Sequence, residues 1–216
     1  MIELLQQYWP MLLEGFKNTL ISSVIALFFS LILGTLMGVL QLTPNKFLRG
    51  FANAYVEFFR NIPLLVIVMF FYAVIPMYFM NISGFVAGTT GLIIYTSSFI
   101  ADNVRAGILS VPTGQMEAGL SQGMKQSDIM RYIILPQAIR IVIPPLGNQF
   151  INLVKNSSIL AMVAGLDLMY YGDFIAMETF NTFDTYILVG VFYLIITLPL
   201  TYLTRKLEVK LGVNDQ

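Results

Sequence analysis

The sequence predicts an all-α integral membrane protein with five transmembrane helices in one domain that covers residues 1–216. Hydrophobic residues make up 57% of the chain and charged residues only 11%, and the mean hydropathy is +0.76. Soluble domains carry roughly 25% charged residues, so this composition is typical of a membrane protein. The charges also leave long apolar stretches, each able to supply the roughly 20 residues that one span needs.

The first three predicted spans follow the gaps between charged residues. Residues 18–40 form the first, in a charge-free stretch that closes at the turn-forming residues 43–45. The charge-free stretch 61–101 is too long for a single helix. Its turn-forming residues 81–84 therefore divide it into a second and a third span.

The last two spans are predicted over residues 139–163 and in the charge-free stretch 185–204. Pro144 and Pro145 interrupt the fourth. Prolines leave backbone carbonyls without partners, which a bilayer tolerates only where protein or water satisfies them. Broken helices near polar residues are a recurring feature of transporters.

Residues 1–14 predict a separate helix on the outer membrane surface. Leu5, Tyr8 and Leu12 recur at helical spacing, with Trp9 beside them. An amphipathic stripe with a tryptophan is typical of a helix that lies in the membrane interface rather than across it.

The distribution of lysine and arginine predicts the orientation. Basic residues gather after the first span, in the segment after the third span and in the C-terminal tail, whereas the opposite side holds Lys17 among acidic residues. The positive-inside rule therefore places the N-terminus outside and the C-terminus in the cytoplasm. The basic residues of the cytoplasmic side are Lys46, Arg49, Arg60, Arg105, Lys125, Arg131, Arg140, Arg205, Lys206 and Lys210.

Composition excludes most enzyme classes. The chain has no cysteine and no histidine, which removes thiol nucleophiles, the Ser-His-acid triad and the usual metal ligands. It has no glycine-rich phosphate loop with a lysine, so we expect no ATP hydrolysis, no metal site and no cofactor bound by this chain. A net charge of zero gives no reason to expect a nucleic-acid partner.

Polar residues inside the apolar spans predict a polar cavity, because such groups are costly in a bilayer and usually functional. On the third span Ser98 and Asp102 share one helix face with Tyr95, and on the fourth Lys155 stands among asparagines and serines. Two alternatives stay open: Asp102 pairs with Arg105 one turn away, or Lys155 makes a structural ion pair or extends to the interface. The candidate substrate contacts are Ser98, Asp102, Asn152, Lys155, Asn156, Ser157 and Ser158.

A water-compatible segment at residues 113–137 interrupts the apolar sequence. It predicts two short helices that are separated at Gly123 and stopped by Pro136. Its spacing resembles the EAA loop of ABC importer permeases, which inserts into a separate ATPase subunit, with Gly119 in place of the usual second alanine. The residues expected to couple to the ATPase are Glu117, Ala118, Gly119, Gly123, Asp128, Leu135 and Pro136.

A wider resemblance, to polar amino-acid permeases, covers residues 10–210. The motifs that carry it lie at residues 59–65, 102–118, 134–138 and 155–160, and Asp102 stands where the family more often has glutamate. The resemblance implies the type I ABC importer permease fold in a bacterial cytoplasmic membrane. It also implies two permease subunits, two ATPase subunits that use ATP and Mg, and an extracytoplasmic binding protein that delivers an amino acid.

The cargo is predicted to be a basic or polar amino acid such as arginine, lysine, histidine or glutamine. Residues 165–184 carry four acidic residues and no basic one, and a negative entrance attracts cations. The alternative is that this acidity follows the positive-inside rule or binds the delivering protein. A small channel or ion-coupled transporter without an ATPase, and a membrane scaffold without transport, are the other functions considered.

Overall fold

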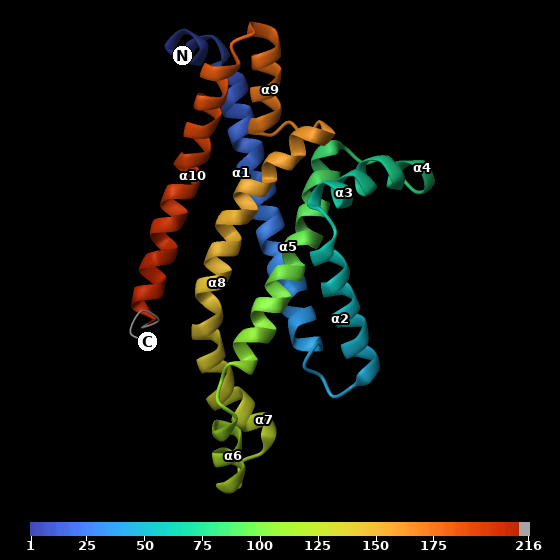
Figure 1. Cartoon of the computed structure of the whole chain (residues 1–216), viewed down its shortest axis with the longest axis vertical. Helices are drawn as coiled ribbons and strands as arrows, with labels where there is room; N and C mark the ends of the chain where they lie inside the picture. The colour runs from blue at the N-terminus through green and yellow to red at the C-terminus, as the bar shows by residue number, and fades with distance from the viewer. Residues whose placement is uncertain (212–216) are drawn as a thin grey trace.

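The computed structural model describes residues 1–211, and these are almost entirely helical. Figure 1 shows an elongated bundle whose long helices run along one axis, with a pair of short helices at the lower end. The all-α prediction is confirmed. The helices of the bundle that are long and apolar enough to cross a membrane are α1 (Ile2–Leu40), α5 (Gly84–Leu109), the run Gln126–Val163 and α10 (Thr182–Lys210).

The packing of α1 on α5 forms the centre of the bundle, and two glycines of α1 permit it. A Cβ at Gly34 would lie 2.6 Å from Cβ of Ile100, and a Cβ at Gly38 would lie 2.7 Å from the Ala101 carbonyl oxygen. Spacings of the Gly-x-x-x-Gly type let two membrane helices approach closely. The two backbones therefore touch where larger residues would separate them.

The prediction of a separate interfacial helix at residues 1–14 is wrong, because these residues are the first turns of α1. Figure 1 shows them at an angle to the rest of the helix. Leu4, Tyr8 and Leu12 are buried in one cluster with residues of α9 (Leu168–Thr179) and α10. An apolar helical stripe fits a protein partner as well as a membrane surface, and here it faces protein.

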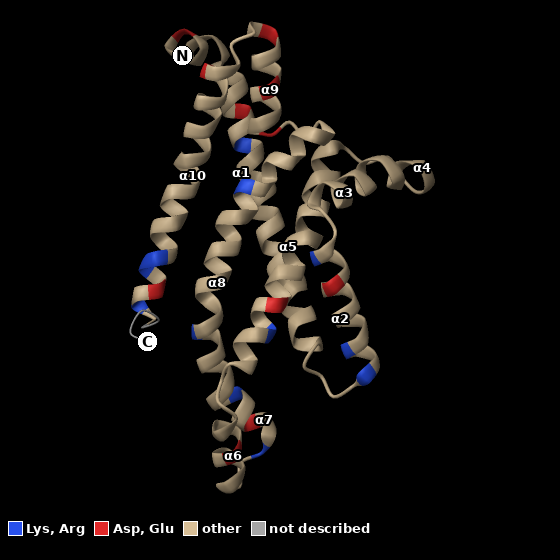
Figure 2. Cartoon of the chain, viewed as in Figure 1, with Lys and Arg blue, Asp and Glu red and all other residues tan. Residues whose placement is uncertain are grey.

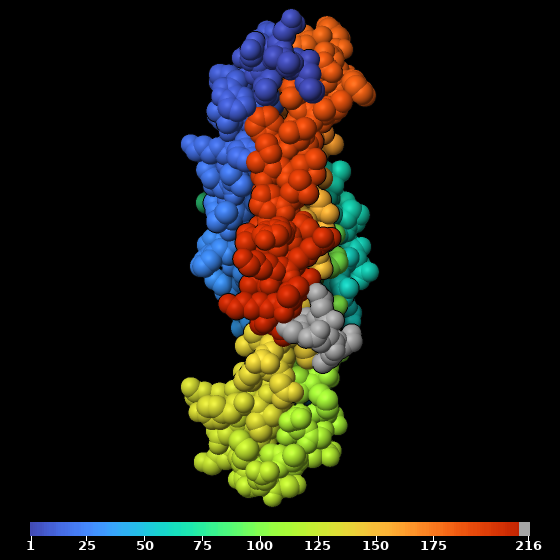
Figure 3. All heavy atoms as spheres, turned by 90° about the vertical axis from the view of Figure 1, so that its left-hand side faces the viewer, coloured from blue at the N-terminus to red at the C-terminus, as the bar shows by residue number. Residues whose placement is uncertain are grey.

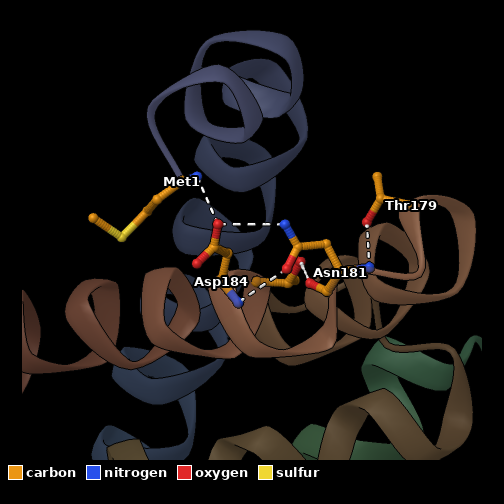
Figure 4. A network of polar contacts seen from close by, with 5 residues as sticks. Met1, Thr179, Asn181 and Asp184 are labelled. Carbon is orange, nitrogen blue, oxygen red and sulfur yellow. Dashed lines mark hydrogen bonds and ion pairs between the residues drawn. The ribbon is translucent and has the colours of Figure 1, made fainter.

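Polar contacts also hold the first turn of α1 against α10. The Met1 amino group lies 2.7 Å from Oδ2 of Asp184. The Asn181 amide donates to the same oxygen, and the Asn181 side-chain oxygen accepts from the Asp184 backbone N–H (Figure 4).

The second hydrophobic region forms two helical segments that meet at a sharp bend, rather than one straight span. Helix α2 covers Lys46–Asn61. It is followed by α3 (Leu64–Met69), a π-helical turn η1 (Phe70–Val74) and α4 (Ile75–Tyr78). The two parts meet at 105°, and with this pair counted as one span the total reaches the predicted five. Pro63 explains the break, because the residue before a proline is pushed out of the helical conformation.

Helix α2 begins earlier than predicted. The Asn45 side chain accepts hydrogen bonds from the backbone N–H groups of Phe47 and Leu48. Asparagine is a preferred residue at this N-terminal position because it satisfies N–H groups that have no partner within the helix. Lys46 and Arg49 therefore lie on a helix and not in a connecting loop.

The fourth span is continuous where breaks were expected. Helix α7 (Gln126–Ile129) runs through a π-helical turn η2 (Met130–Ile134) into α8 (Leu135–Asn156). Pro136 lies in the first turn of α8, directly after the π-helical turn, and the helix continues through it instead of stopping. Pro144 and Pro145 remain inside α8. The change of geometry comes later, at a 3₁₀ segment η3 (Ser157–Val163), with left-handed Ala164 and Leu166 after it.

The charges are distributed unevenly along the bundle (Figure 2). Basic residues cluster at the lower end, near the start of α2, in the short helices and at the end of α10, while α9 at the other end carries acidic residues and no basic one. This arrangement agrees with the predicted orientation, which stays a prediction.

The tight α1–α5 contact predicts that Gly34→Ala destabilises the protein. Alanine favours a helix over glycine by about 1 kcal/mol, but the added methyl group would displace Ile100, and such crowding costs about 1–3 kcal/mol. We expect a lower melting temperature for the detergent-purified protein. The matched control is Gly50→Ala on α2, where a Cβ meets no atom within 4 Å. Equal melting temperatures for the two variants would contradict the close approach of α1 and α5.

Candidate functional site

A pair of short helices projects from one end of the bundle. Helix α6 covers Thr113–Ser121 and α7 follows it after a turn. In the space-filling view of Figure 3 they form a separate lobe at the lower end of the molecule. Gly123 makes the turn with φ of +78°, a conformation that glycine adopts without steric cost. The predicted separation of two helices at Gly123 is therefore confirmed.

The lobe has its own small core, which fixes it to the start of α8. Val111, Ile129, Ile134 and Ala138 are buried together. Gly119 packs directly on Ile129, since a Cβ there would lie 2.6 Å from Ile129 Cγ1. The glycine in place of an alanine thus leaves room for the Ile129 side chain, and the two short helices pack against each other and against the start of α8.

The outer surface of the lobe is open to a partner. Glu117, Ala118 and Lys125 are exposed, and Leu120 and Tyr132 expose 52% and 64% of their area. Apolar groups of this size on the surface of the lobe, next to charges, are typical of a protein-binding surface. Asp128 lies in the first turn of α7, where a negative charge suits the helix N-terminus.

Leu135 and Pro136 belong to the base of the lobe rather than to its tip. Leu135 is partly buried and lines an apolar cavity of about 270 Å³ between α1, α5 and α8. Pro136 is exposed beside it. Both lie where the lobe meets the membrane helices.

Asp102 forms an ion pair with Arg60, which the sequence did not predict. Arg60 Nη1 lies 2.9 Å from Asp102 Oδ2, so the ion pair joins the end of α2 to α5. The alternative pairing of Asp102 with Arg105 is wrong. The Arg60 guanidinium also lies over the Phe99 ring, 5.3 Å from its centroid, in a cation–π contact.

Ser98 and its neighbour Ser97 complete the polar part of α5. Both are fully buried. The Ser98 hydroxyl donates to the Tyr95 carbonyl oxygen at 2.7 Å, within its own helix. The Ser97 hydroxyl lies 2.6 Å from the Tyr55 hydroxyl of α2, a contact that the sequence did not predict.

The polar residues at the end of α8 lie at a different cavity. Lys155 and Ser158 line a cavity of about 320 Å³, which Tyr193 of α10 also lines. Asn152 and Asn156 are partly buried. The lining residues from α9 and α10 are Met169, Tyr186, Val189, Gly190 and Tyr193.

The two serines after Asn156 bond mainly to their own backbone. The Ser157 hydroxyl is buried and donates to the Val154 carbonyl oxygen at 2.7 Å, and the Ser158 hydroxyl donates to the Lys155 carbonyl oxygen at 2.9 Å. These bonds support the transition from α8 into η3.

Asp102 and Lys155 do not share one cavity. Helix α8 and the η3 segment after it run antiparallel to α5, with Gly88 against Leu160 of η3 and Gly107 against Val142 of α8. Lys155 is therefore level with about residue 93 of α5. At 1.5 Å per residue, this separates it from Asp102 by roughly 13 Å along the helix axes. The two polar clusters therefore lie at different levels of the bundle.

Asp167 is a buried carboxylate that sequence reasoning placed on the acidic outer surface. Its side chain is fully buried and accepts hydrogen bonds from the backbone N–H groups of Met169 and Tyr170, which begin α9. The Tyr193 hydroxyl donates to it at 3.4 Å. Burial raises the pKa of Asp167 to about 6, although the hydrogen bonds lower it. The sequence signal was its position directly before an apolar helix.

Comparison of the sequence with protein families identifies the kind of membrane protein that carries these polar clusters and the projecting lobe. Residues 30–212 match the family described as the binding-protein-dependent transport system inner membrane component. The chain belongs to this family. It is therefore a permease, the membrane subunit of an ABC importer, and the separate ATPase subunit hydrolyses ATP.

Relatives of this permease agree with it over nearly its whole length. It is 53% identical over 211 residues to the probable glutamine ABC transporter permease protein GlnM of Bacillus subtilis, a match that covers 96% of this chain and 98% of the relative. It is 36% identical over 206 residues to the glutamine transport system permease protein GlnP of Escherichia coli K12, covering 94% of each.

Solved structures confirm the predicted importer-permease fold. The permease superposes on the crystal structure of an amino acid ABC transporter with histidines with a TM-score of 0.90 and 33% identity, covering 95% of this chain and 96% of that one. An inward-facing conformation of the MetNI methionine ABC transporter gives a TM-score of 0.79 at 22% identity, covering 95% and 98%, and shows the fold alone. Family and fold exclude the channel and the scaffold as the function.

The buried carboxylate predicts a pH-dependent effect of Asp167→Asn. A carboxylate whose folded-state pKa is raised binds a proton more tightly when folded, so stability falls as pH rises from about 4 to about 6 and stays lower above that range. Asparagine begins a helix about as well as aspartate and carries no charge. We expect Asp167→Asn to raise the melting temperature at pH 8, with a smaller gain at pH 5.

Asp167→Ala separates the two roles of this side chain. It removes the charge and the hydrogen bonds to the start of α9 together, so it should destabilise relative to asparagine at both pH values by about 1 kcal/mol. A gain for Asp167→Asn that is equal at pH 5 and pH 8 would contradict the burial argument.

Proposed function

We propose that this permease imports a polar amino acid, glutamine in the first place, across a bacterial cytoplasmic membrane. The 53% identity to a probable glutamine permease carries this proposal. The polar groups within the spans support it, because an amino acid needs both a cation or N–H donors and an acceptor along its path. Basic amino acids are the second candidate, favoured by Asp173 and Glu178 on α9.

The working assembly is proposed to contain two permease subunits, two ATPase subunits that bind ATP and Mg, and an extracytoplasmic binding protein. Alternating access needs two membrane parts that move against each other around a central site. This permease binds no cofactor of its own. The concentration of basic residues at the end that carries the lobe (Figure 2) supports a cytoplasmic lobe, with the N-terminus outside and the C-terminus inside.

The amino acid is proposed to meet two groups of polar residues in succession. In the proposed orientation, the cavity at Lys155 and Ser158 lies nearer the outside, with Asn152 and Asn156 beside it. Asp102 lies deeper, roughly 13 Å closer to the lobe, as the antiparallel packing of α5 and α8 indicates, and the buried Ser98 lies one turn before it on α5. Buried Ser157 contributes by holding the backbone of η3 in place.

Transport assays test the cargo directly. The permease, its ATPase and its binding protein are reconstituted in proteoliposomes with labelled glutamine, arginine and glutamate. We expect saturable, ATP-dependent uptake in which glutamine is preferred. A preference for glutamate would contradict the proposal, and uptake without ATP would contradict the importer assembly.

The turn at Gly123 predicts a coupling defect for Gly123→Val. A β-branched residue at φ of +78° costs about 1–3 kcal/mol of backbone strain, so the turn reorganises and the exposed face of the lobe loses its shape. We expect uptake per ATP hydrolysed to fall at least tenfold while membrane insertion is retained.

The control for this variant is Gly114→Val in the same lobe. Gly114 has ordinary helical geometry, and a Cβ there meets no atom within 4 Å. The ratio of transport to ATP hydrolysis should therefore change little. An equal loss in both variants would show that the left-handed turn is not what couples the lobe to the ATPase.

A further inference from the structure

We propose that Arg60 determines cargo specificity together with Asp102. In this proposal the guanidinium binds the α-carboxylate of the amino acid, the second oxygen of Asp102 binds its ammonium group, and the pair as a whole gives the site no net charge. The inference rests on the proposed import of an amino acid and names the residue that selects its charge.

The pair lies between membrane-spanning elements, on a face that lipid does not cover. Arg60 lies in the last turn of α2, immediately before the 105° bend, and Asp102 lies inside the candidate span α5. Their side chains are 39% and 35% exposed. Charged groups on a membrane helix do not face hydrocarbon but a water-filled cavity or another protein surface. The face that carries the pair must therefore be covered by one of these.

The pair has hydrogen-bonding capacity that the described residues leave unused. Within residues 1–211, the contact between Arg60 Nη1 and Asp102 Oδ2 is the polar contact that the pair makes. A guanidinium has five N–H donors and a carboxylate two acceptor oxygens. The guanidinium is planar and lies over the Phe99 ring, 5.3 Å from its centroid, and its remaining N–H groups form the planar fork that suits a carboxylate.

Lys155 cannot take this role for an amino acid held by Asp102. The two charged groups of an amino acid are joined through a single carbon atom, whereas Lys155 and Asp102 are separated by roughly 13 Å along the helix axes. Arg60 is in contact with Asp102 and therefore suits a ligand of this size.

The neutral pair favours cargo without net charge. Glutamine is a zwitterion and adds no unbalanced charge when it binds beside an existing ion pair. Arginine or glutamate would bring one uncompensated charge into a membrane-embedded site, which is costly. Removing Arg60 alone leaves the carboxylate of Asp102 unbalanced, and the site should then favour a cation.

Direct binding to the assembled permease–ATPase complex, without the binding protein, tests this proposal. Labelled glutamine and arginine are titrated against wild type, Arg60→Gln and Arg60→Lys. We expect Arg60→Gln to weaken glutamine binding at least tenfold and to raise the affinity for arginine relative to glutamine at least tenfold. Arg60→Lys keeps the charge and loses the planar fork, so it should weaken binding while glutamine remains preferred.

Two further variants serve as controls. Arg49→Gln removes an exposed arginine from the same helix and should leave both affinities unchanged. The double variant Arg60→Gln, Asp102→Asn restores a site without net charge, so the gain in relative arginine affinity should disappear.

Three results would overturn the inference. If Arg60→Gln lowers the melting temperature but leaves the ratio of arginine to glutamine affinity as in wild type, the ion pair is structural only. A double variant that still favours arginine as strongly as Arg60→Gln would contradict the charge argument. A wild-type complex that transports no amino acid would overturn the proposed function itself, because that failure does not depend on Arg60.

Discussion

The close packing of α1 on α5 is the contact on which the rest of the permease depends. Gly34 and Gly38 bring the two backbones together, and α5 then has its other faces available for α2, α3, α8 and η3. In a bilayer, lipid offers helices no hydrophobic driving force to associate, so such close van der Waals contact supplies the stabilisation. Because α5 is central and also contacts α2, Asp102 of α5 lies within reach of Arg60 of α2.

The same helix joins the membrane site to the lobe. Helix α5 leads into α6 through a short turn, and α7 continues through η2 into α8 without a break. The buried contact between Gly119 and Ile129 makes the two short helices one unit. The lobe is therefore connected directly to both helices that carry the polar residues, with Asp102 on α5 and Lys155 on α8.

The errors of sequence reasoning share one physical cause. Proline predicts a stop or break in a helix, but the helix continues from η2 past Pro136, and Pro144 and Pro145 stay inside α8. The apolar stripe of residues 1–14 was assigned to a membrane surface, yet it packs on α9 and α10. In each case the local sequence pattern is present in the chain, but the pattern does not specify which neighbouring helix packs against it.

The sequence alone determined the all-helical membrane fold, the position of the lobe and its turn at Gly123, because composition, charge gaps and glycine chemistry are local properties. It also singled out Asp102 and Lys155 as costly charges. Only the tertiary structure decided that Asp102 pairs with Arg60, that Lys155 lies at a different level, and that Asp167 is buried. Those outcomes depend on which helix faces come together, and long-range packing of this kind leaves no periodic signal in the chain.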